Sequence, residues 1–178
     1  MRGFTAIELM VTVAILAVLA SLAAPSFTPV IERWRVRSAV EGLQSTIYYA
    51  RSEAIKRGGG VVIQKNPNTA QCTTSANQEW DCGWFVCEDV NNDGVCNATE
   101  PVLQRFDTPS QVNVTRTSGG ATIILNRWGL VDGAWLGFSL VPFNKSTSDL
   151  AARGVCMSIG GRLRVIAPQD IPCSASNS

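Results

Sequence analysis

The sequence has 178 residues, of which 46% are hydrophobic and 16% are charged, and its formal net charge is +1. This length suits one domain with an appendage and excludes two large independent cores. The chain has no histidine. That absence excludes Ser-His-Asp and Cys-His catalysis and most zinc hydrolase sites, so we do not expect an enzyme.

The charge is segregated along the chain. Residues 1–71 carry a net charge of +4, residues 72–109 carry −6 and residues 110–178 carry +3. Separate acidic and basic segments predict different partners for different faces, and they argue against binding of nucleic acid over the whole surface.

The first 24 residues contain a long apolar segment. From Phe4 to Ala24 the only polar side chains are those of four residues, Thr5, Glu8, Thr12 and Ser21. As a helix, this segment would extend about 31 Å, which is enough to cross a bilayer core. A secretory signal peptide is an alternative, but its apolar stretch is normally shorter and ends at a small-x-small site. A plain membrane anchor leaves the buried carboxylate of Glu8 unexplained.

The stretch Gly3-Phe4-Thr5-Ala6-Ile7-Glu8-Leu9-Met10-Val11 resembles the class III signal of type IV pilins and type II secretion pseudopilins. The resemblance implies a leader over residues 1–3, cleavage by a prepilin peptidase between Gly3 and Phe4, and N-methylation of Phe4. It also implies that Glu8 pairs with the terminal ammonium of a neighbouring subunit during assembly. The leader is short for the family, and a start codon further upstream is one explanation.

The implied topology is a single pass through the inner membrane over residues 4–24. Arg2 places a positive charge at the cytoplasmic N-terminus, and the C-terminal domain is then periplasmic. The expected partners are other pilins through the N-terminal helix, the prepilin peptidase and the inner membrane.

Residues 25–57 are predicted to continue the helix as an amphipathic segment. Pro25 and Pro29 should kink or interrupt it, because each lacks a backbone donor. Beyond them an apolar stripe recurs every three or four residues, which predicts packing on a domain. The stripe comprises Val36, Val40, Leu43, Ile47, Ala50 and Ala54. Basic residues followed by Gly58-Gly59-Gly60 predict the end of the helix.

Residues 58–178 are predicted to form a β-rich periplasmic domain, because short runs of β-forming residues alternate with turn residues there. The fold class is therefore α+β, with one long kinked helix packed on an antiparallel sheet. The expected strands cover residues 60–64, 84–88, 102–106, 111–116, 122–125, 135–141, 155–159 and 162–166. The five tryptophans are expected to pack in the core and on the sheet, and the alternative is a platform on which bases stack. Trp80, which has polar neighbours, is the first candidate for an exception to core packing. The five are Trp34, Trp80, Trp84, Trp128 and Trp135.

Four later stretches resemble the GspH/FimT-type minor pilins and pseudopilins, one branch of the same superfamily. These stretches are Arg37-Ser38-Ala39, Ala50-Arg51-Ser52-Glu53-Ala54-Ile55-Lys56-Arg57, Gly83-Trp84-Phe85-Val86 and Gly161-Arg162-Leu163-Arg164-Val165. They occur in the order that this branch shows. The resemblance implies the type IV pilin-like fold.

All six cysteines lie beyond the predicted helix, which is typical of an oxidising compartment. We expect Cys156 to pair with Cys173 and the other four cysteines to pair locally, although six cysteines permit fifteen pairings. A zinc site of four thiolates is the alternative, but the closest spacing, Cys82-x4-Cys87, lacks the tight pairs of such sites.

Residues 89–100 match the calcium-loop pattern D-x-[DN]-x-[DN]-G-x5-E at every fixed position. The candidate ligands are Asp89, Asn91, Asp93 and Glu100. The segments on either side are predicted strands instead of helices, and the same residues are typical of a plain turn. Both interpretations stay open, and no cofactor other than this candidate Ca²⁺ is expected.

Gly161-Arg162-Leu163-Arg164 is the second candidate site. On a strand, Arg162 and Arg164 would share one face about 6.6 Å apart, with Leu163 and Val165 facing the core. Two such guanidinium groups can bind neighbouring phosphates of double-stranded DNA without reading bases. The stretch resembles the DNA-binding motif of FimT-type minor pilins used in natural transformation. A solvated strand with no ligand is the alternative.

The sequence therefore predicts a minor pilin or pseudopilin of a type IV pilus or type II secretion filament. Three roles stay open within that prediction. They are DNA binding through Arg162 and Arg164, a GspH-like role in protein secretion without nucleic-acid binding, and priming of pilus assembly.

Overall fold

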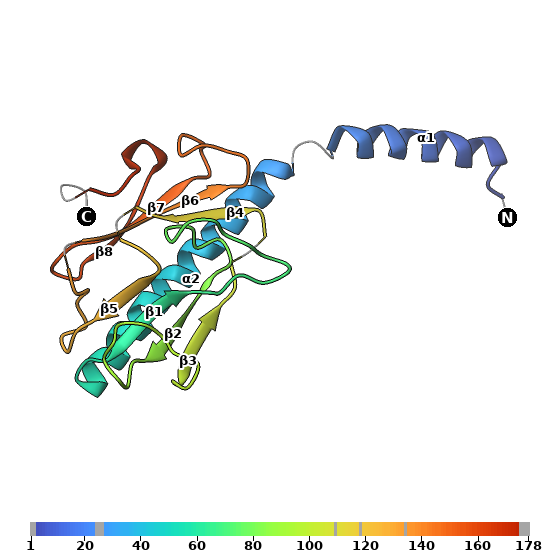
Figure 1. Cartoon of the computed structure of the whole chain (residues 1–178). Coiled ribbons are helices and arrows are strands. Elements are labelled where there is room, and N and C mark those ends of the chain that lie inside the picture. The colour runs from blue at the N-terminus through green and yellow to red at the C-terminus, as the bar shows by residue number, and fades with distance from the viewer. Residues whose placement is uncertain (1–2, 24–26, 109, 118, 134, 175–178) are drawn as a thin grey trace.

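The computed structural model describes residues 3–23, 27–108, 110–117, 119–133 and 135–174. Two helices precede eight strands and a short 3-10 helix (Figure 1). These elements are α1 (Ala6–Ala23), α2 (Thr28–Arg57), β1 (Val61–Lys65), β2 (Trp84–Glu88), β3 (Val102–Phe106), β4 (Val112–Arg116), β5 (Thr122–Leu125), β6 (Leu136–Pro142), β7 (Arg153–Met157), β8 (Leu163–Ile166) and η2 (Pro168–Asp170). The predicted α+β fold class is confirmed.

The helical third of the chain is divided into two helices. The first ends at Ala23 and the second begins at Thr28, with Pro29 in its first turn. Proline fits there because the first helical amide groups have no partner within the helix. Pro25, the other predicted break, lies outside the described residues. The second helix ends as predicted, at Gly58 with φ 77° and an N–H that donates to Ala54 O.

Helix α2 packs through the predicted apolar stripe. Its buried residues are Val36, Ala39, Val40, Leu43, Thr46, Ile47, Ala50 and Ala54. This stripe forms the main core cluster together with residues from both sheets. Inside it, Trp84 Nε1 donates to Thr46 Oγ1 at 2.9 Å, and the Trp84 ring stacks on Phe106 with ring centroids 4.8 Å apart. The Phe106 ring also lies so close to the helix that a Cβ at Gly42 would be 2.2 Å from it.

The strands divide between two four-stranded antiparallel sheets. The strand order is β3-β2-β1-β5 in one sheet and β4-β6-β7-β8 in the other. An isolated bridge pairs Glu79 with Thr115, a residue of β4. Figure 1 shows α2 running along the strands of both sheets. The sequence predicts one antiparallel sheet on the helix, whereas the structure divides the strands between two sheets.

Predictions about four individual side chains are wrong. Trp34 and Trp128, expected in the core, are 67% and 66% exposed, and Trp80 and Val165 also differ from the expectation. Trp80 is fully buried: its ring packs edge-on against Phe138 at 5.1 Å, and its Nε1 donates to Gly120 O at 3.3 Å. Val165 was expected in the core but is 43% exposed. It faces the same side of the sheet as its buried partner Val155, but β8 is the edge strand, so nothing beyond it covers the side chain.

Three disulfides join all six cysteines: Cys72–Cys82, Cys87–Cys96 and Cys156–Cys173. The last is the predicted pair, and the other four cysteines pair locally as expected. The arrangement leaves no free cysteine.

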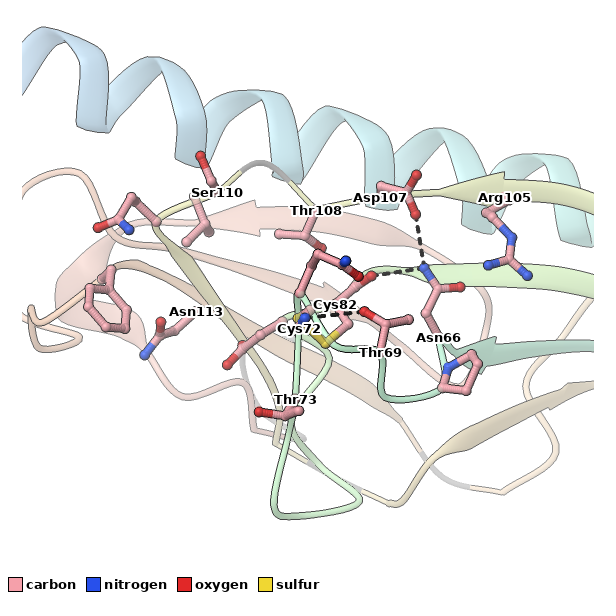
Figure 2. A pocket seen from close by; sticks show the side chains of 16 residues that line it. Asn66, Thr69, Cys72, Thr73, Cys82, Arg105, Asp107, Thr108, Ser110 and Asn113 are labelled. Carbon is pink, nitrogen blue, oxygen red and sulfur yellow. Dashed lines mark hydrogen bonds between the residues drawn. A yellow bond between two sulfur atoms is a disulfide. The ribbon is translucent and has the colours of Figure 1, made fainter.

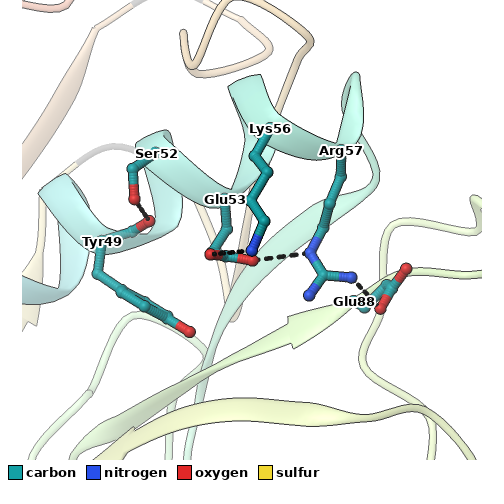
Figure 3. Close-up of polar contacts among 6 residues, drawn as sticks. All are labelled: Tyr49, Ser52, Glu53, Lys56, Arg57 and Glu88. Atoms are coloured by element: carbon teal, nitrogen blue, oxygen red, sulfur yellow. Dashed lines mark hydrogen bonds and ion pairs between the residues drawn. The ribbon is translucent and has the colours of Figure 1, made fainter.

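A charged contact joins the end of α2 to β2. Arg57 Nε donates to Glu53 Oε2 at 2.9 Å, and Arg57 Nη1 donates to Glu88 Oε2 (Figure 3). The hydrogen bond from Arg57 is the main cause of the lowered pKa of the Glu53 carboxyl. The contact fixes the strand end from which residues 89–100 continue.

Candidate functional site

The predicted cleavage site lies at an exposed end of the chain. Gly3 and Phe4 precede α1 and are exposed, whereas Met1 and Arg2 lie outside the described residues. Glu8 is in the first turn of α1, where its Oε2 accepts hydrogen bonds from Thr5 N and Thr5 Oγ1, each at 2.9 Å. Glu8 N donates in return to Thr5 Oγ1 at 3.3 Å. This reciprocal pattern is a capping box.

The capping role of Thr5 was missed, although the spacing Thr5-x-x-Glu8 could have indicated it. The role gives the Glu8 carboxylate a partner inside a single chain. Most large apolar side chains of α1, such as Ile7, Met10 and Leu16, are exposed. In the described part of the chain, no helix has both the length and the hydropathy that crossing a membrane requires.

The candidate calcium residues lie together in one loop, which we call the acidic loop (residues 89–100). Asp89 is buried, and its two carboxylate oxygens accept from Asp93 N at 3.1 Å and Gly94 N at 2.8 Å. Glu100 accepts from Val90 N at 2.8 Å and, through its other oxygen, from Asn97 N at 2.8 Å. The carboxylates thus hold the loop through its own amide groups.

Asp93 is the centre of a second set of bonds in the acidic loop. Its Oδ2 accepts from Asn91 Nδ2 at 2.9 Å and Asn97 Nδ2 at 2.8 Å, and its Oδ1 accepts from Val95 N at 2.9 Å. These donors lower the pKa of the Asp93 carboxyl, the Asn97 amide most of all. Across the described ranges, no three Asp, Glu, Cys or His side chains are grouped to hold a metal ion. Calcium binding stays a prediction.

The candidate arginines lie at the connection between β7 and β8, which we call the basic hairpin (residues 158–164). Ser158 N donates to Arg162 O at 3.0 Å, and Gly161 N donates to Ser158 O at 2.8 Å, which closes the turn. Arg162 and Arg164 are both exposed, and Arg164 pairs in register with Cys156. The guanidinium groups of Arg162 and Arg164 form no hydrogen bond or ion pair with another described residue.

Gly161 is buried and is required for this turn. Its φ is +80°, and a Cβ there would lie 2.6 Å from Arg51 Nη2 and 2.8 Å from Leu130 Cδ2. Arg51, on α2, donates from Nη1 to Gly161 O at 2.5 Å. The sequence could not indicate this contact, because the two residues are 110 positions apart.

The chain also has a polar pocket of about 610 Å³ beside the Cys72–Cys82 disulfide. Figure 2 shows its lining of amide, hydroxyl and carboxyl side chains. Asn66 is buried there and donates from Nδ2 to Cys82 O at 2.8 Å and Asp107 Oδ1 at 3.2 Å. Burial raises the pKa of Asp81, which accepts from Val114 N. Among its described lining residues, none is a nucleophile hydrogen-bonded to a base.

Comparison with known proteins identifies the family. The family described as Type II transport protein GspH matches residues 39–161, which is more than half of the chain. Two relatives named fimbrial protein, from Pseudomonas aeruginosa, are each 29% identical over 75% of this chain and 71% of their own length.

Two crystal structures of the Pseudomonas aeruginosa type IV minor pilin FimU have the same fold. Their TM-scores are 0.57 and 0.60 at 21% identity, and they cover 78% and 81% of this chain and 98% and 97% of their own chains. The chain therefore belongs to the GspH family and is a GspH/FimT-type minor pilin or pseudopilin, a structural protein of a family whose members assemble with other pilins.

Proposed function

We propose that this protein is a minor pilin of a type IV pilus, cleaved between Gly3 and Phe4 by a prepilin peptidase and methylated at Phe4. Residues 4–24 would hold it in the inner membrane, with the C-terminal domain in the periplasm, until it enters the filament. The observation that carries the proposal is helix α1, whose large apolar side chains are exposed and which begins at Ala6, two residues after the exposed Phe4. An apolar surface of this extent needs lipid or other helices as partners.

Glu8 would set the register of assembly. Its carboxylate is bound by Thr5 in the single chain, so it is already ordered on the surface of α1. After cleavage, the new ammonium group of Phe4 in a neighbouring subunit is a suitable partner, because a carboxylate transferred into an apolar bundle requires a positive charge. A misplaced subunit would leave Glu8 buried and unpaired.

The test of processing is mass spectrometry of the full-length chain made with and without a prepilin peptidase. We expect the peptidase to remove residues 1–3 and to add one methyl group to Phe4. Glu8→Gln keeps a cap acceptor but removes the charge, so cleavage should persist while incorporation into pili falls. A wild-type chain that keeps residues 1–3 would overturn the proposed processing.

Membrane attachment has its own test. The full-length chain should fractionate with inner membranes and resist extraction by high salt, whereas a chain beginning at Thr28 should be released. Equal release of both chains would overturn the proposed anchor.

The alternative is a GspH-like pseudopilin that acts in protein secretion without binding nucleic acid. The matched family carries the type II transport description, whereas the fimbrial relatives and FimU favour the pilus. Deletion of the gene from its host separates the two. Loss of surface pili with normal secretion would support the pilus role, and the reverse result would support the secretion role.

A second proposed function is contact with double-stranded DNA through Arg162 and Arg164. Two observations favour it: both side chains are exposed, and Arg51 holds the preceding Gly161 in place. Arginine side chains that the fold leaves without partners can contact phosphates at no cost to folding.

The test titrates the full-length chain in a non-ionic detergent against a short DNA duplex over a series of salt concentrations. Binding should weaken as salt rises and be lost in the Arg162→Ala/Arg164→Ala variant. Arg33→Ala/Arg35→Ala on α2 removes the same charge elsewhere and should bind like the wild type. Equal losses in both variants, or no wild-type binding at low salt, would count against a DNA contact at this hairpin.

A further inference from the structure

A second turn next to the basic hairpin presents an exposed aromatic ring. This tryptophan turn (residues 126–130) connects β5 to the bridge at Val131. Trp128 is 66% exposed, and the guanidinium carbon of Arg127 lies 5.2 Å from the centroid of its ring. The pair therefore forms a cation–π contact on the surface of the domain.

The tryptophan turn is held in one conformation by its own residues. Asn126 Oδ1 accepts from Trp128 N at 3.0 Å and from Leu130 N at 3.1 Å, and Asn126 N donates to Leu130 O at 2.9 Å. Gly129 has φ +68°, a conformation that favours glycine. The indole is thus presented by an ordered backbone and needs little further ordering to bind a ligand.

Arg51 joins the tryptophan turn to the basic hairpin. Its Nε donates to Gly129 O at 2.8 Å, while its Nη1 donates to Gly161 O at 2.5 Å. Leu130 also contacts the hairpin, because a Cβ at Gly161 would be 2.8 Å from its Cδ2. One guanidinium group therefore holds the backbones of two turns side by side, so the turn that carries Arg127 and Trp128 lies next to the turn that carries Arg162.

The chemistry of this surface differs from that of a plain basic patch. Phosphates of a duplex require only positive charge, and the stacked bases of a duplex cannot reach an indole face. A single strand can stack an unpaired base on an aromatic ring while arginines bind the adjoining phosphates. A cation next to the ring strengthens such a surface further.

From this juxtaposition we propose that Trp128 and Arg127 form a stacking site for an unpaired base, which makes single-stranded DNA or a frayed DNA end the preferred ligand of this face. The inference rests on the proposed DNA contact and specifies its substrate. Arg162 and Arg164 bind the adjoining phosphates, and Trp128 adds affinity for the single strand alone.

The test uses the full-length chain in non-ionic detergent with dye-labelled oligo(dT) and a blunt duplex of equal length, each followed by fluorescence anisotropy. Trp128→Leu should weaken binding of the single strand by roughly 5- to 150-fold, since stacking contributes about 1–3 kcal/mol per base, and leave duplex binding unchanged. Trp128→Phe should restore most of the lost affinity. Trp34→Leu, at a tryptophan on α2 that is 67% exposed, is the matched control and should have no effect.

The outcomes separate this inference from the function on which it rests. One possible result is that duplex binding depends on Arg162 and Arg164 while Trp128→Leu changes the affinity for neither ligand. That result would overturn the stacking site but would still support the DNA contact. If Trp128→Leu weakens the binding of single strand and duplex equally, the stacking site is also overturned. If Trp128→Leu impairs pilus assembly without changing DNA affinity, the ring belongs to a contact between subunits. No binding of either ligand by the wild type would overturn the DNA contact itself.

Discussion

The acidic loop and the basic hairpin are built on similar supports. Each follows a strand whose penultimate residue is a disulfide-bonded cysteine, Cys87 in β2 and Cys156 in β7. Each also turns at a glycine with positive φ, 79° at Gly94 and 80° at Gly161. The backbone requirements of the two connections are therefore alike, and their charged side chains distinguish them.

The charged groups of the two connections have opposite uses. In the acidic loop, carboxylates such as Asp89 accept hydrogen bonds from loop amides, so the charge contributes to folding. In the basic hairpin, Arg162 and Arg164 point to solvent, and the turn is held from outside by Arg51. A charged side chain that the fold does not use is available to a ligand, whereas one that satisfies the backbone is not.

The largest expected effect is the loss of stability in an Asp89→Ala variant. Gly94 N would lose its acceptor and Asp93 N would keep only Asn91 Oδ1, so the loss of these two bonds to a buried carboxylate should cost about 2 to 4 kcal/mol in the free energy of unfolding. Arg164→Ala should change that free energy by less than about 0.5 kcal/mol. Urea unfolding of the oxidised protein, followed by circular dichroism, measures both. Similar values for the two variants would break the comparison.

The next largest effect is expected for Arg51→Ala. The variant removes two hydrogen bonds from one charged group, so the free energy of unfolding should fall by about 1.5 to 3 kcal/mol. Amide exchange should accelerate at Gly129 and Gly161, because their turns lose a common support. Arg37→Ala removes an exposed ion pair with Glu41 and serves as the control, with almost no expected change. Unchanged exchange in both turns would show that Arg51 does not position the hairpin.

Local sequence patterns predicted the helices and strands. The pairing of the strands into sheets depends on long-range contacts, which could not be predicted from the sequence. The spacing of Leu43 and Ile47 predicted the buried face of α2, because helical periodicity is a property of neighbouring residues. The division into two sheets depends on pairings between strands that are distant in the sequence, such as β1 with β5, in which Val61 pairs with Leu125. No local pattern specifies such pairings.

The candidate sites show the same limit. The residues of the acidic loop were identified from their pattern, but their use as acceptors for loop amides was not, because one pattern suits both a metal ligand and a turn. Trp80 was misjudged from its polar neighbours, since its burial depends on Phe138 and Gly120, which are distant in the sequence. The partners of Arg51 are 78 and 110 positions away, which no motif can encode.

A smaller effect is expected when the pH is lowered. The pKa of Asp93 lies below its ordinary value of 3.8, so the folded loop favours the charged form. Its contribution to stability is fully present above that ordinary value and is lost as the pH falls through the lower pKa of the folded state. Amide chemical shifts, followed from about pH 6 to about pH 2, should move at the Val95 backbone amide and the Asn97 side-chain amide and stay nearly constant at the Gly161 backbone amide. Asp93→Asn should remove most of the movement at Val95, and equal movement in the hairpin would contradict the assignment.

The smallest effect is expected from calcium. If the acidic loop is a plain turn without a metal site, Ca²⁺ should not change the thermal stability of the protein. Asp89, Asp93 and Glu100 already accept hydrogen bonds from the acidic loop, and Ca²⁺ would compete with these donors for the same oxygens. Thermal unfolding in Ca²⁺ should therefore match unfolding in Mg²⁺ at equal ionic strength. A true site would stabilise the fold by about 2.7 kcal/mol at one hundred times its Kd. A rise in Tm that saturates with Ca²⁺, and that Glu100→Gln abolishes, would instead establish the calcium site and give the acidic loop a ligand outside the chain, as we propose for the basic hairpin.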